Sequence, residues 1–280
     1  MHLLSAPSRA SSGVVRLKGG QVIHDVTYGS GPTKVIMFHG LGGEHGIYRW
    51  PGSLADALGL TLLFPWLPCH GPSSDTDNFE EAVGFMTEYR EQRGAVDSLV
   101  IGHSFGGALA TALCAERGRT LAMAAPIDPR FLRMTWAESQ MRLGWVGLDL
   151  LGCIAAGALE SLFRLDACSY FPAVAGTLFG GHRIGLGIRV LRSMPNLTPA
   201  IHQANSSGRV PLRLWGLADF GVQPPPVGLL PGGDWYLPWV RHGDFALRLG
   251  YPYPMIRRGA AVQLGRADPL HVPFLTHSAA

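Results

Sequence analysis

The sequence predicts an α/β protein with a mostly parallel central sheet and helices on both of its faces. Short runs of apolar, β-forming residues alternate with helical segments through the first half of the chain. Such runs are typical of parallel strands that are buried on both faces. Hydrophobic residues make up 47% of the 280 residues and charged residues only 15%, against about 25% charged in an average soluble domain. A large buried core is therefore expected, and a disordered chain is excluded.

Strand and helix signals follow one another in order along this core. A Gly-Gly pair at 19–20 joins the first two strands as a hairpin, and continuous apolar runs indicate the buried strands that follow. Asn78 and Glu81 form a capping-box pattern that begins a helix, and the small residues of 105–117 allow a helix to pack closely on a sheet. The expected strands are 14–17, 22–28, 34–39, 60–66, 98–103, 121–125, 211–215 and 236–241, and the expected core helices are 54–58, 78–93, 105–117 and 245–258.

The alternation stops between residues 130 and 209, where the signal is helical, apolar and broken by loops. We interpret residues 1–129 and 210–280 as an α/β core and residues 130–209 as a helical lid inserted into it. In segment 148–165 the polar residues form one narrow stripe at the helical period, and the other residues are apolar. Such a helix is expected to be buried almost all round or to cover an apolar cavity.

A chemically specific pattern lies at Gly102-His103-Ser104-Phe105-Gly106. A predicted strand enters this GxSxG pattern and a predicted helix leaves it, which is the strand–turn–helix context of a nucleophile elbow. The two glycines remove the Cβ clashes of so sharp a turn. The Ser104 hydroxyl is then expected at the carboxyl end of the strand, with the Phe105 amide pointing toward any oxyanion that forms there.

The sequence resembles the α/β-hydrolase superfamily across nearly the whole chain, and three segments carry the resemblance. GHSFGG (102–107) is similar to its nucleophile elbow, VIMFHGLGG (35–43) to its strand ending in His-Gly, and PLRLWGLAD (211–219) to its acid-bearing strand. The resemblance implies that Ser104 is the nucleophile. It implies no cofactor and no metal, because a Ser-His-Asp triad needs neither.

The resemblance also assigns the oxyanion loop. The donors would be the amides of Phe105 and Leu41, or of Gly42 if the loop turns one residue later. His39 is expected to brace this loop by hydrogen bonds. The residues expected to line the substrate site are Gly40, Gly42 and His103, with a structural role as the alternative for His103.

The acid and the base are expected after late strands. Asp219 stands in a Trp-Gly-x-x-Asp segment like that of the family, and Asp128 is the alternative because some members place the acid after an earlier strand. His242 begins His-Gly-Asp-Phe, which resembles the His-x-Asp-Phe segment of acid-lipase-like members. The chain order Ser104, Asp219, His242 matches the usual order of the fold. His271 in the C-terminal tail is the alternative base.

The sequence departs from the family pattern in the loop after the fourth strand, and its nucleophile residue differs from that of two branches of the family. Many members have Asp-x-x-Gly-His-Gly-x-Ser after the fourth strand, but here Trp66 takes the Asp position and Leu-Pro-Cys-His-Gly-Pro-Ser follows. The role of this loop is therefore left open. The nucleophile position holds Ser104 and not an Asp, which argues against the haloalkane dehalogenase and epoxide hydrolase branches, because these form an ester on a carboxylate.

These features predict a serine hydrolase that cleaves a carboxylic ester of a moderately hydrophobic small molecule through an acyl-enzyme. The apolar and aromatic residues of the lid favour such a substrate. The alternatives are the same triad acting on a thioester, an amide or a C–C bond, or in perhydrolysis, and a non-catalytic ligand-binding member of the fold.

Charge and composition bear on partners and compartment. The net charge of +3 comes from scattered residues, which argues against a nucleic-acid partner. The four cysteines show no CxxC or metal-type spacing and are expected to be buried small hydrophobes. Neither a signal-peptide pattern nor a transmembrane run is found, so a cytoplasmic protein is expected, with peripheral membrane contact through an apolar surface still open. The sequence does not determine the oligomeric state.

Overall fold

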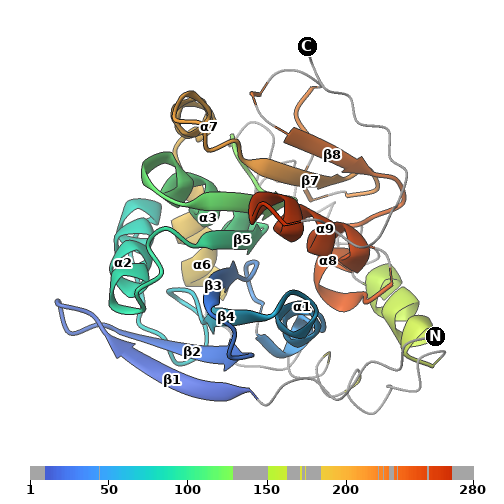
Figure 1. The fold of residues 1–280 in the computed structure, drawn as a ribbon, viewed down its shortest axis with the longest axis horizontal. Helices are drawn as coiled ribbons and strands as arrows, with labels where there is room; N and C mark the ends of the chain where they lie inside the picture. Colours follow the sequence, from blue (N-terminus) through green and yellow to red (C-terminus); the bar gives the residue numbers. More distant parts are fainter. Residues whose placement is uncertain are drawn as a thin grey trace.

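A computed structural model describes residues 10–43, 45–128, 151–162, 171, 174, 184–219, 221–222, 224–226, 230–231, 233–250 and 252–266. Its strands are β1 (Ser11–Arg16), β2 (Val22–Tyr28), β3 (Thr33–Phe38), β4 (Leu60–Pro65), β5 (Leu99–His103), β6 (Arg119–Met123), β7 (Leu212–Gly216) and β8 (Gly233–Leu237). They form one sheet in the order β1-β2-β4-β3-β5-β6-β7-β8 (Figure 1). Strands β3 to β8 are parallel, and β2 pairs antiparallel with both β1 and β4. The predicted α/β class with a mostly parallel sheet is confirmed.

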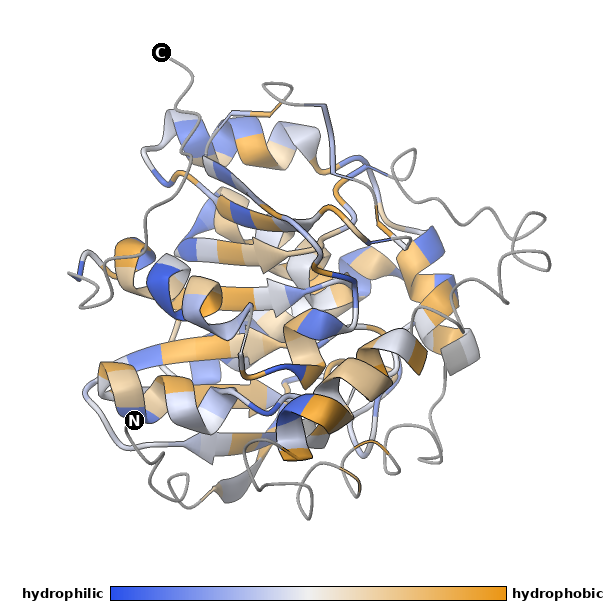
Figure 2. Ribbon diagram, turned by 90° about the vertical axis from the view of Figure 1, so that its right-hand side faces the viewer, coloured by the Kyte–Doolittle hydropathy of each residue, from blue (hydrophilic) through white to orange (hydrophobic). Residues whose placement is uncertain are grey.

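Helices cover both faces of this sheet (Figure 1). One face carries α2 (Phe79–Gln92), α3 (Phe105–Glu116), α6 (Ile184–Arg192) and α7 (Thr198–Ser206), and the other carries α1 (Pro51–Leu58), α8 (Asp244–Leu247) and α9 (Tyr253–Gln263). Ile36 and Phe38 of β3 belong to the apolar cluster of the first face, and Val35 and Met37 to that of the second. The inner strands are accordingly mostly orange in Figure 2, as expected of strands buried on both sides.

Local sequence accounts for the two helices next to the nucleophile elbow. The Asn78 side chain accepts the amide of Glu81 at 2.9 Å, so the predicted cap of α2 is present. On α3, a Cβ atom at Gly106 would lie 2.4 Å from the carbonyl oxygen of His39 and 2.5 Å from that of Phe38. Only glycine therefore allows α3 to approach the end of β3 so closely.

Two elements near the C-terminus differ from the prediction. The single helix expected at 245–258 is two helices, α8 and α9, because the chain breaks around Gly250 and Pro252. Pro252 has no amide hydrogen and stands at the N-cap of α9. The strand expected at 236–241 is β8, which ends earlier because Pro238 cannot donate to a neighbouring strand.

The described part of the predicted lid includes a helix at 151–162. The pattern of 148–165 predicted a helix here. Of its two alternatives, burial almost all round is wrong, and cover over an apolar cavity stays a prediction. Its polar edge faces the molecule, since the Glu160 carboxylate accepts the amide of Leu249 at 2.9 Å. Its large apolar side chains that are more than half exposed are Leu151, Leu159 and Leu162.

The rest of the predicted lid is described only from residue 184 onward. Helix α7 packs on α3, and its Ile201 is buried in the cluster of that face. The end of segment 130–209 therefore lies against the core. Residues 129–150 and most of 163–183 lie outside the described residues, so the lid as a whole stays a prediction.

The described cysteines are buried. Cys69, Cys114 and Cys153 are in no disulfide, and Cys168 lies outside the described residues. Among the helices that the structure describes, none combines the length and hydropathy needed to cross a bilayer.

Gly106 and Gly84 make a matched test of the close packing at α3. Gly106→Ala pushes a Cβ atom into two backbone carbonyls, so we expect the free energy of unfolding to fall by about 3 kcal/mol. A Cβ atom at the exposed Gly84 of α2 would meet nothing within 4 Å, so Gly84→Ala is expected to raise it by about 0.5–1 kcal/mol. Urea denaturation measures both changes. A Gly106→Ala protein as stable as the wild type would contradict the packing described here.

Candidate active site

Ser104 lies in the sharp turn between β5 and α3 with a strained backbone. Its φ is 52° and its ψ is −121°, a combination that residues with a side chain rarely adopt. The conformation is held from both sides, because the Ser104 amide donates to the Met123 carbonyl at 2.9 Å and the Ser104 carbonyl accepts from the Ala108 amide at 3.1 Å. The side chain is thereby held at the carboxyl end of β5, as predicted for a nucleophile elbow.

Gly40, at the end of β3, lies directly beside this turn. A Cβ atom on Gly40 would be 3.2 Å from Ser104 Cβ and 3.1 Å from His103 Nδ1. The loop that follows β3 therefore packs on the elbow, and the absence of a side chain at Gly40 permits that contact.

The amides of loop 40–43 divide into engaged and available donors. The engaged donors are the Gly40 amide, to Tyr48 Oη at 2.7 Å, the Gly42 amide, to His70 Nε2 at 3.0 Å, and the Gly43 amide, to the Gly40 carbonyl at 2.9 Å. Within the described residues, no hydrogen bond uses the amide of Leu41 or of Phe105. Leu41 and Phe105 are the predicted oxyanion donors, whereas the alternative donor, Gly42, is committed to His70.

Two histidines, His39 and His70, hold this loop by hydrogen bonds. His39 Nδ1 lies 2.8 Å from the Gly40 carbonyl and its Nε2 accepts the Leu67 amide at 3.0 Å, so the predicted bracing by His39 is confirmed. His70 acts in the same way, with Nδ1 2.9 Å from the Pro68 carbonyl and Nε2 accepting the Gly42 amide. Each ring faces one carbonyl and one amide hydrogen, which is the pattern that a neutral imidazole satisfies.

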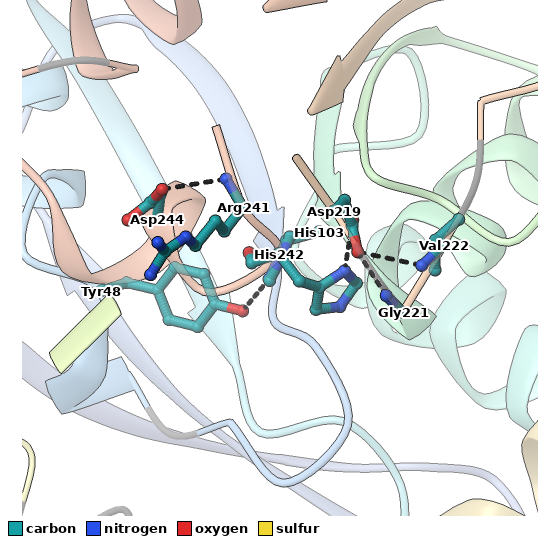
Figure 3. A network of polar contacts seen from close by, with 8 residues as sticks. All are labelled: Tyr48, His103, Asp219, Gly221, Val222, Arg241, His242 and Asp244. Carbon is teal, nitrogen blue, oxygen red and sulfur yellow. Dashed lines mark hydrogen bonds and ion pairs between the residues drawn. The ribbon is translucent and has the colours of Figure 1, made fainter. Parts of the chain in front are cut away.

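Asp219 and His242 meet at the carboxyl ends of β7 and β8 (Figure 3). His242 Nδ1 donates to Asp219 Oδ2 at 2.8 Å, and the Asp219 side chain is fully buried while that of His242 is 27% exposed. Asp219 Oδ1 accepts the amides of Gly221 at 2.7 Å and Val222 at 2.9 Å. With its proton on Nδ1, neutral His242 keeps Nε2 as a base.

The environment keeps Asp219 ionised. Burial by itself raises the pKa of Asp219, but the charge and hydrogen bond of His242 and the amides of Val222 and Gly221 outweigh it, and the pKa lies below its usual value. The carboxylate can therefore hold the His242 tautomer at neutral pH.

Asp128 and His271 are the alternative acid and the alternative base from the sequence. Asp128 is buried after β6, but the single hydrogen on His242 Nδ1 is already given to Asp219. His271, the alternative base, lies outside the described residues.

His103 was expected either to line the substrate site or to be structural, and both of its ring nitrogens are engaged in contacts within the protein. Nδ1 lies 2.7 Å from Tyr48 Oη, and Nε2 lies 3.0 Å from the carbonyl of His242. Burial first, and the nearby charge of His242 second, lower the pKa of His103 to about 3. The ring is therefore neutral at neutral pH and presents no free nitrogen to a substrate.

Sequence reasoning missed Tyr48 and left the role of His70 open. Tyr48 follows the short 3-10 helix η1 (His45–Ile47), and no local pattern distinguishes it. For His70 the signal was the family-like His-Gly-x-Ser segment, whose missing Asp is replaced by Trp66. The Trp66 ring lies against Gly71, where a Cβ atom would be 2.4 Å away.

Two stretches of the predicted lid contact this site at different points. In α6, a Cβ atom at Gly187 would lie 2.4 Å from Leu41 Cδ1 and 3.5 Å from His70 Cε1. In helix 151–162, Cys153 lies 3.2 Å from the Cβ position of Gly243, the residue after His242. One stretch therefore touches the oxyanion loop, and the other touches the turn that carries the histidine.

The site offers a hydroxyl, an imidazole and a carboxylate. Within the residues that the structure describes, no three His, Cys, Asp or Glu side chains gather as a metal site would require. The groups that can carry chemistry here are Ser104, His242 and Asp219.

Comparisons with known proteins identify the family. The model of the alpha/beta hydrolase family matches residues 35–280. A curated relative, the dihydrolipoyllysine-residue acetyltransferase component of the acetoin cleaving system of Cupriavidus necator, is 30% identical over 215 residues, which are 68% of this chain and 53% of the relative. The chain thus spans about half the length of this relative.

Solved structures share the fold across nearly the whole chain. An alpha/beta hydrolase fold protein from Nakamurella multipartita has a TM-score of 0.67 at 17% identity, covering 91% of this chain and 99% of its own. Haloalkane dehalogenase DbeA from Bradyrhizobium elkani has a TM-score of 0.63 at 18% identity, covering 92% and 98%. A bacterial membrane phospholipase A has a TM-score of 0.62 at 14% identity, covering 91% and 86%. At these identities the likeness concerns the fold alone.

The neutral His103 predicts a specific pH dependence of stability. Its pKa is about 3 in the folded protein and about 6.5 in the unfolded chain. Below pH 6.5 the unfolded state therefore binds a proton that the folded state refuses, so stability is lost as the pH falls from about 6.5 toward about 3. The free energy of unfolding of the wild type should fall more steeply over this range than that of His103→Gln, which has no such proton to bind.

Urea denaturation at a series of pH values measures this difference. His242 and Asp219, the other titrating groups beside His103, are present in both proteins and cancel in the comparison. Parallel pH profiles for the two proteins would contradict the buried, neutral His103.

Proposed function

Because the chain belongs to the alpha/beta hydrolase family, we propose that it is a serine hydrolase that cleaves a carboxylic ester of a moderately hydrophobic small molecule through an acyl-enzyme. The observation that carries the proposal is the strained backbone of Ser104. Strain of about 1–3 kcal/mol persists only where the surrounding structure fixes it, and it is typical of functional residues. The hydrogen-bonded pair of Asp219 and His242 supports the same chemistry.

In this proposal His242 Nε2 takes the proton of the Ser104 hydroxyl as Oγ attacks the ester carbonyl. Asp219 stabilises the imidazolium that forms. The amides of Leu41 and Phe105 donate to the developing oxyanion. His242 then gives its proton to the leaving alkoxide, the acyl group stays on Ser104, and a water activated by His242 releases the carboxylic acid.

The apolar surroundings favour a hydrophobic acyl or aryl group. Residues 130–209 are proposed as a cap, and its stretches at Gly187 and Cys153 contact the oxyanion loop and the turn of His242. A serine hydroxyl cannot form the aspartyl ester of dehalogenases and epoxide hydrolases, which supports ester cleavage over those reactions.

A second candidate is acyl transfer to a thiol. The Cupriavidus necator relative is named as a dihydrolipoyllysine-residue acetyltransferase component and is 30% identical. The same acyl-enzyme would pass its acyl group to a dithiol such as dihydrolipoamide, which forms a thioester and frees the Ser104 hydroxyl.

Serine labelling and a set of variants test the first candidate. A fluorophosphonate should label Ser104, and Ser104→Ala and His242→Ala should each lower kcat on p-nitrophenyl esters by about 10⁴-fold or more. His271→Ala should keep activity. The control His202→Ala removes an exposed histidine of α7 and should also leave activity unchanged.

The outcomes separate the alternatives. A wild-type protein that binds apolar esters but is never labelled would point to the non-catalytic, ligand-binding class. Loss of activity in His271→Ala with retention in His242→Ala would overturn the assignment of the base.

A competition between acyl acceptors separates hydrolysis from transfer. With p-nitrophenyl acetate as donor, we expect acetate as the main product even when dihydrolipoamide is present. Mass spectrometry of the products measures the ratio. Acetyl-dihydrolipoamide as the main product would favour the second candidate, with the same dependence on Ser104.

A further inference from the structure

Tyr48 and His103 form a buried polar link between the oxyanion loop and the turn that carries His242 (Figure 3). Tyr48 is 4% exposed and His103 is 5% exposed. The link runs from the Gly40 amide to Tyr48 Oη at 2.7 Å, from Tyr48 Oη to His103 Nδ1 at 2.7 Å, and from His103 Nε2 to the His242 carbonyl at 3.0 Å.

The two ends of this link fix the position of every hydrogen in it. The Gly40 amide can only donate, so Tyr48 Oη accepts there and gives its own hydrogen to His103 Nδ1. The carbonyl of His242 can only accept, so His103 carries its hydrogen on Nε2. One arrangement satisfies all three bonds, and it needs His103 in its neutral Nε2–H form.

The environment of His103 and Tyr48 keeps both side chains neutral, as this arrangement of hydrogens requires. Burial and the adjacent His242 hold the pKa of His103 at about 3, and burial raises the pKa of Tyr48 above its usual value although the Gly40 amide partly opposes this. The rings of His103 and His242 lie 4.9 Å apart. A positive charge on His242 would therefore disfavour a second charge on His103, and the link keeps its direction while His242 is protonated.

We propose that Tyr48 and His103 are positioning residues, which hold the oxyanion loop and the backbone of His242 at a fixed separation across Ser104. The inference rests on the proposed serine-hydrolase function. The Asp219 contact fixes the ring of His242, but it leaves the backbone of that residue to other contacts. The hydrogen bond from His103 Nε2 to the His242 carbonyl connects that backbone to β5. The Tyr48 hydroxyl connects His103 in turn to the Gly40 amide. A shift of about 1 Å in such a geometry lowers rates by up to about a hundredfold.

The first test compares two buried tyrosines. Tyr48→Phe keeps the ring and removes the hydroxyl that joins Gly40 to His103. Tyr89→Phe is the matched control, because the Tyr89 hydroxyl is also buried and donates to Asp25 at 2.6 Å, in the packing of α2 on β2. Both variants lose one hydroxyl and some stability, but only one of them lies in the link.

We expect Tyr48→Phe to lower kcat on a p-nitrophenyl ester by about 10- to 100-fold with KM changed by less than about twofold. The rate of Ser104 phosphonylation by a fluorophosphonate should fall by a similar factor. Tyr89→Phe should stay within about twofold of the wild type in all three quantities. Equal kcat values for Tyr48→Phe and Tyr89→Phe would overturn the positioning role.

The second test is rescue at His103. A glutamine amide offers an acceptor oxygen and a donor nitrogen, as the neutral ring offers one acceptor and one donor nitrogen, whereas leucine offers neither. His103→Gln should therefore keep more than half of the wild-type kcat, and His103→Leu should fall as far as Tyr48→Phe. Equal losses in His103→Gln and His103→Leu would indicate that ring packing alone matters, which contradicts the proposal.

Failure of the proposed function gives a different result from failure of this inference. A wild-type protein that is not labelled at Ser104 would overturn the serine-hydrolase function, and the positioning role with it. A labelled wild type with an equally labelled Tyr48→Phe would overturn the positioning role alone. Nitrogen NMR of the histidine rings checks the link without any activity, because a protonated Nδ1 on His103 at neutral pH would contradict the hydrogen arrangement.

Discussion

The close approach of helix α3 to the ends of β3 and β5 is the constraint on which the site depends. A Cβ atom at Gly102 would lie 2.3 Å from the Gly106 carbonyl oxygen, and one at Gly106 would meet the carbonyls of β3. Because no side chain keeps these segments apart, the chain reverses within one residue, and Ser104 adopts its strained backbone. The same contact sets Gly40 beside Ser104. One steric condition thus fixes the candidate nucleophile and its oxyanion loop together.

The hydrogen bonds of that loop follow from the cost of leaving amides unpaired. A buried amide without a partner costs about 1–3 kcal/mol, and side chains from other segments take the amides of Gly40 and Gly42. The Leu41 amide is the donor of the loop for which the described residues provide no acceptor. An available donor that directly follows Gly40, the residue packed against the strained Ser104, is the arrangement expected where an oxyanion forms.

The low charge fraction of the chain has two structural sources. The inner strands are buried on both faces and carry apolar residues throughout, as Val35 and Ile36 of β3 do. The helix at 151–162 adds the exposed leucines described above, because its polar edge is used for contacts such as that of Glu160 with Arg248. These leucines lie on the side of the helix opposite Cys153, the residue that contacts Gly243 in the turn of His242.

The sequence by itself determined the α/β class, the elbow at Ser104 and the order in which Asp219 and His242 follow it. These features are local, since a buried strand needs a continuous apolar run and a sharp turn needs small neighbours. Only the tertiary structure decided which loop amide stays available and that His242 pairs with Asp219. It also decided that the polar edge of the helix at 151–162 faces the core and that Tyr48 belongs to the site. These outcomes depend on partners far apart in the chain, such as His103 and the carbonyl of His242, which are 139 positions apart. Hydrogen-bond partners are chosen by proximity in space, and no local pattern carries that information.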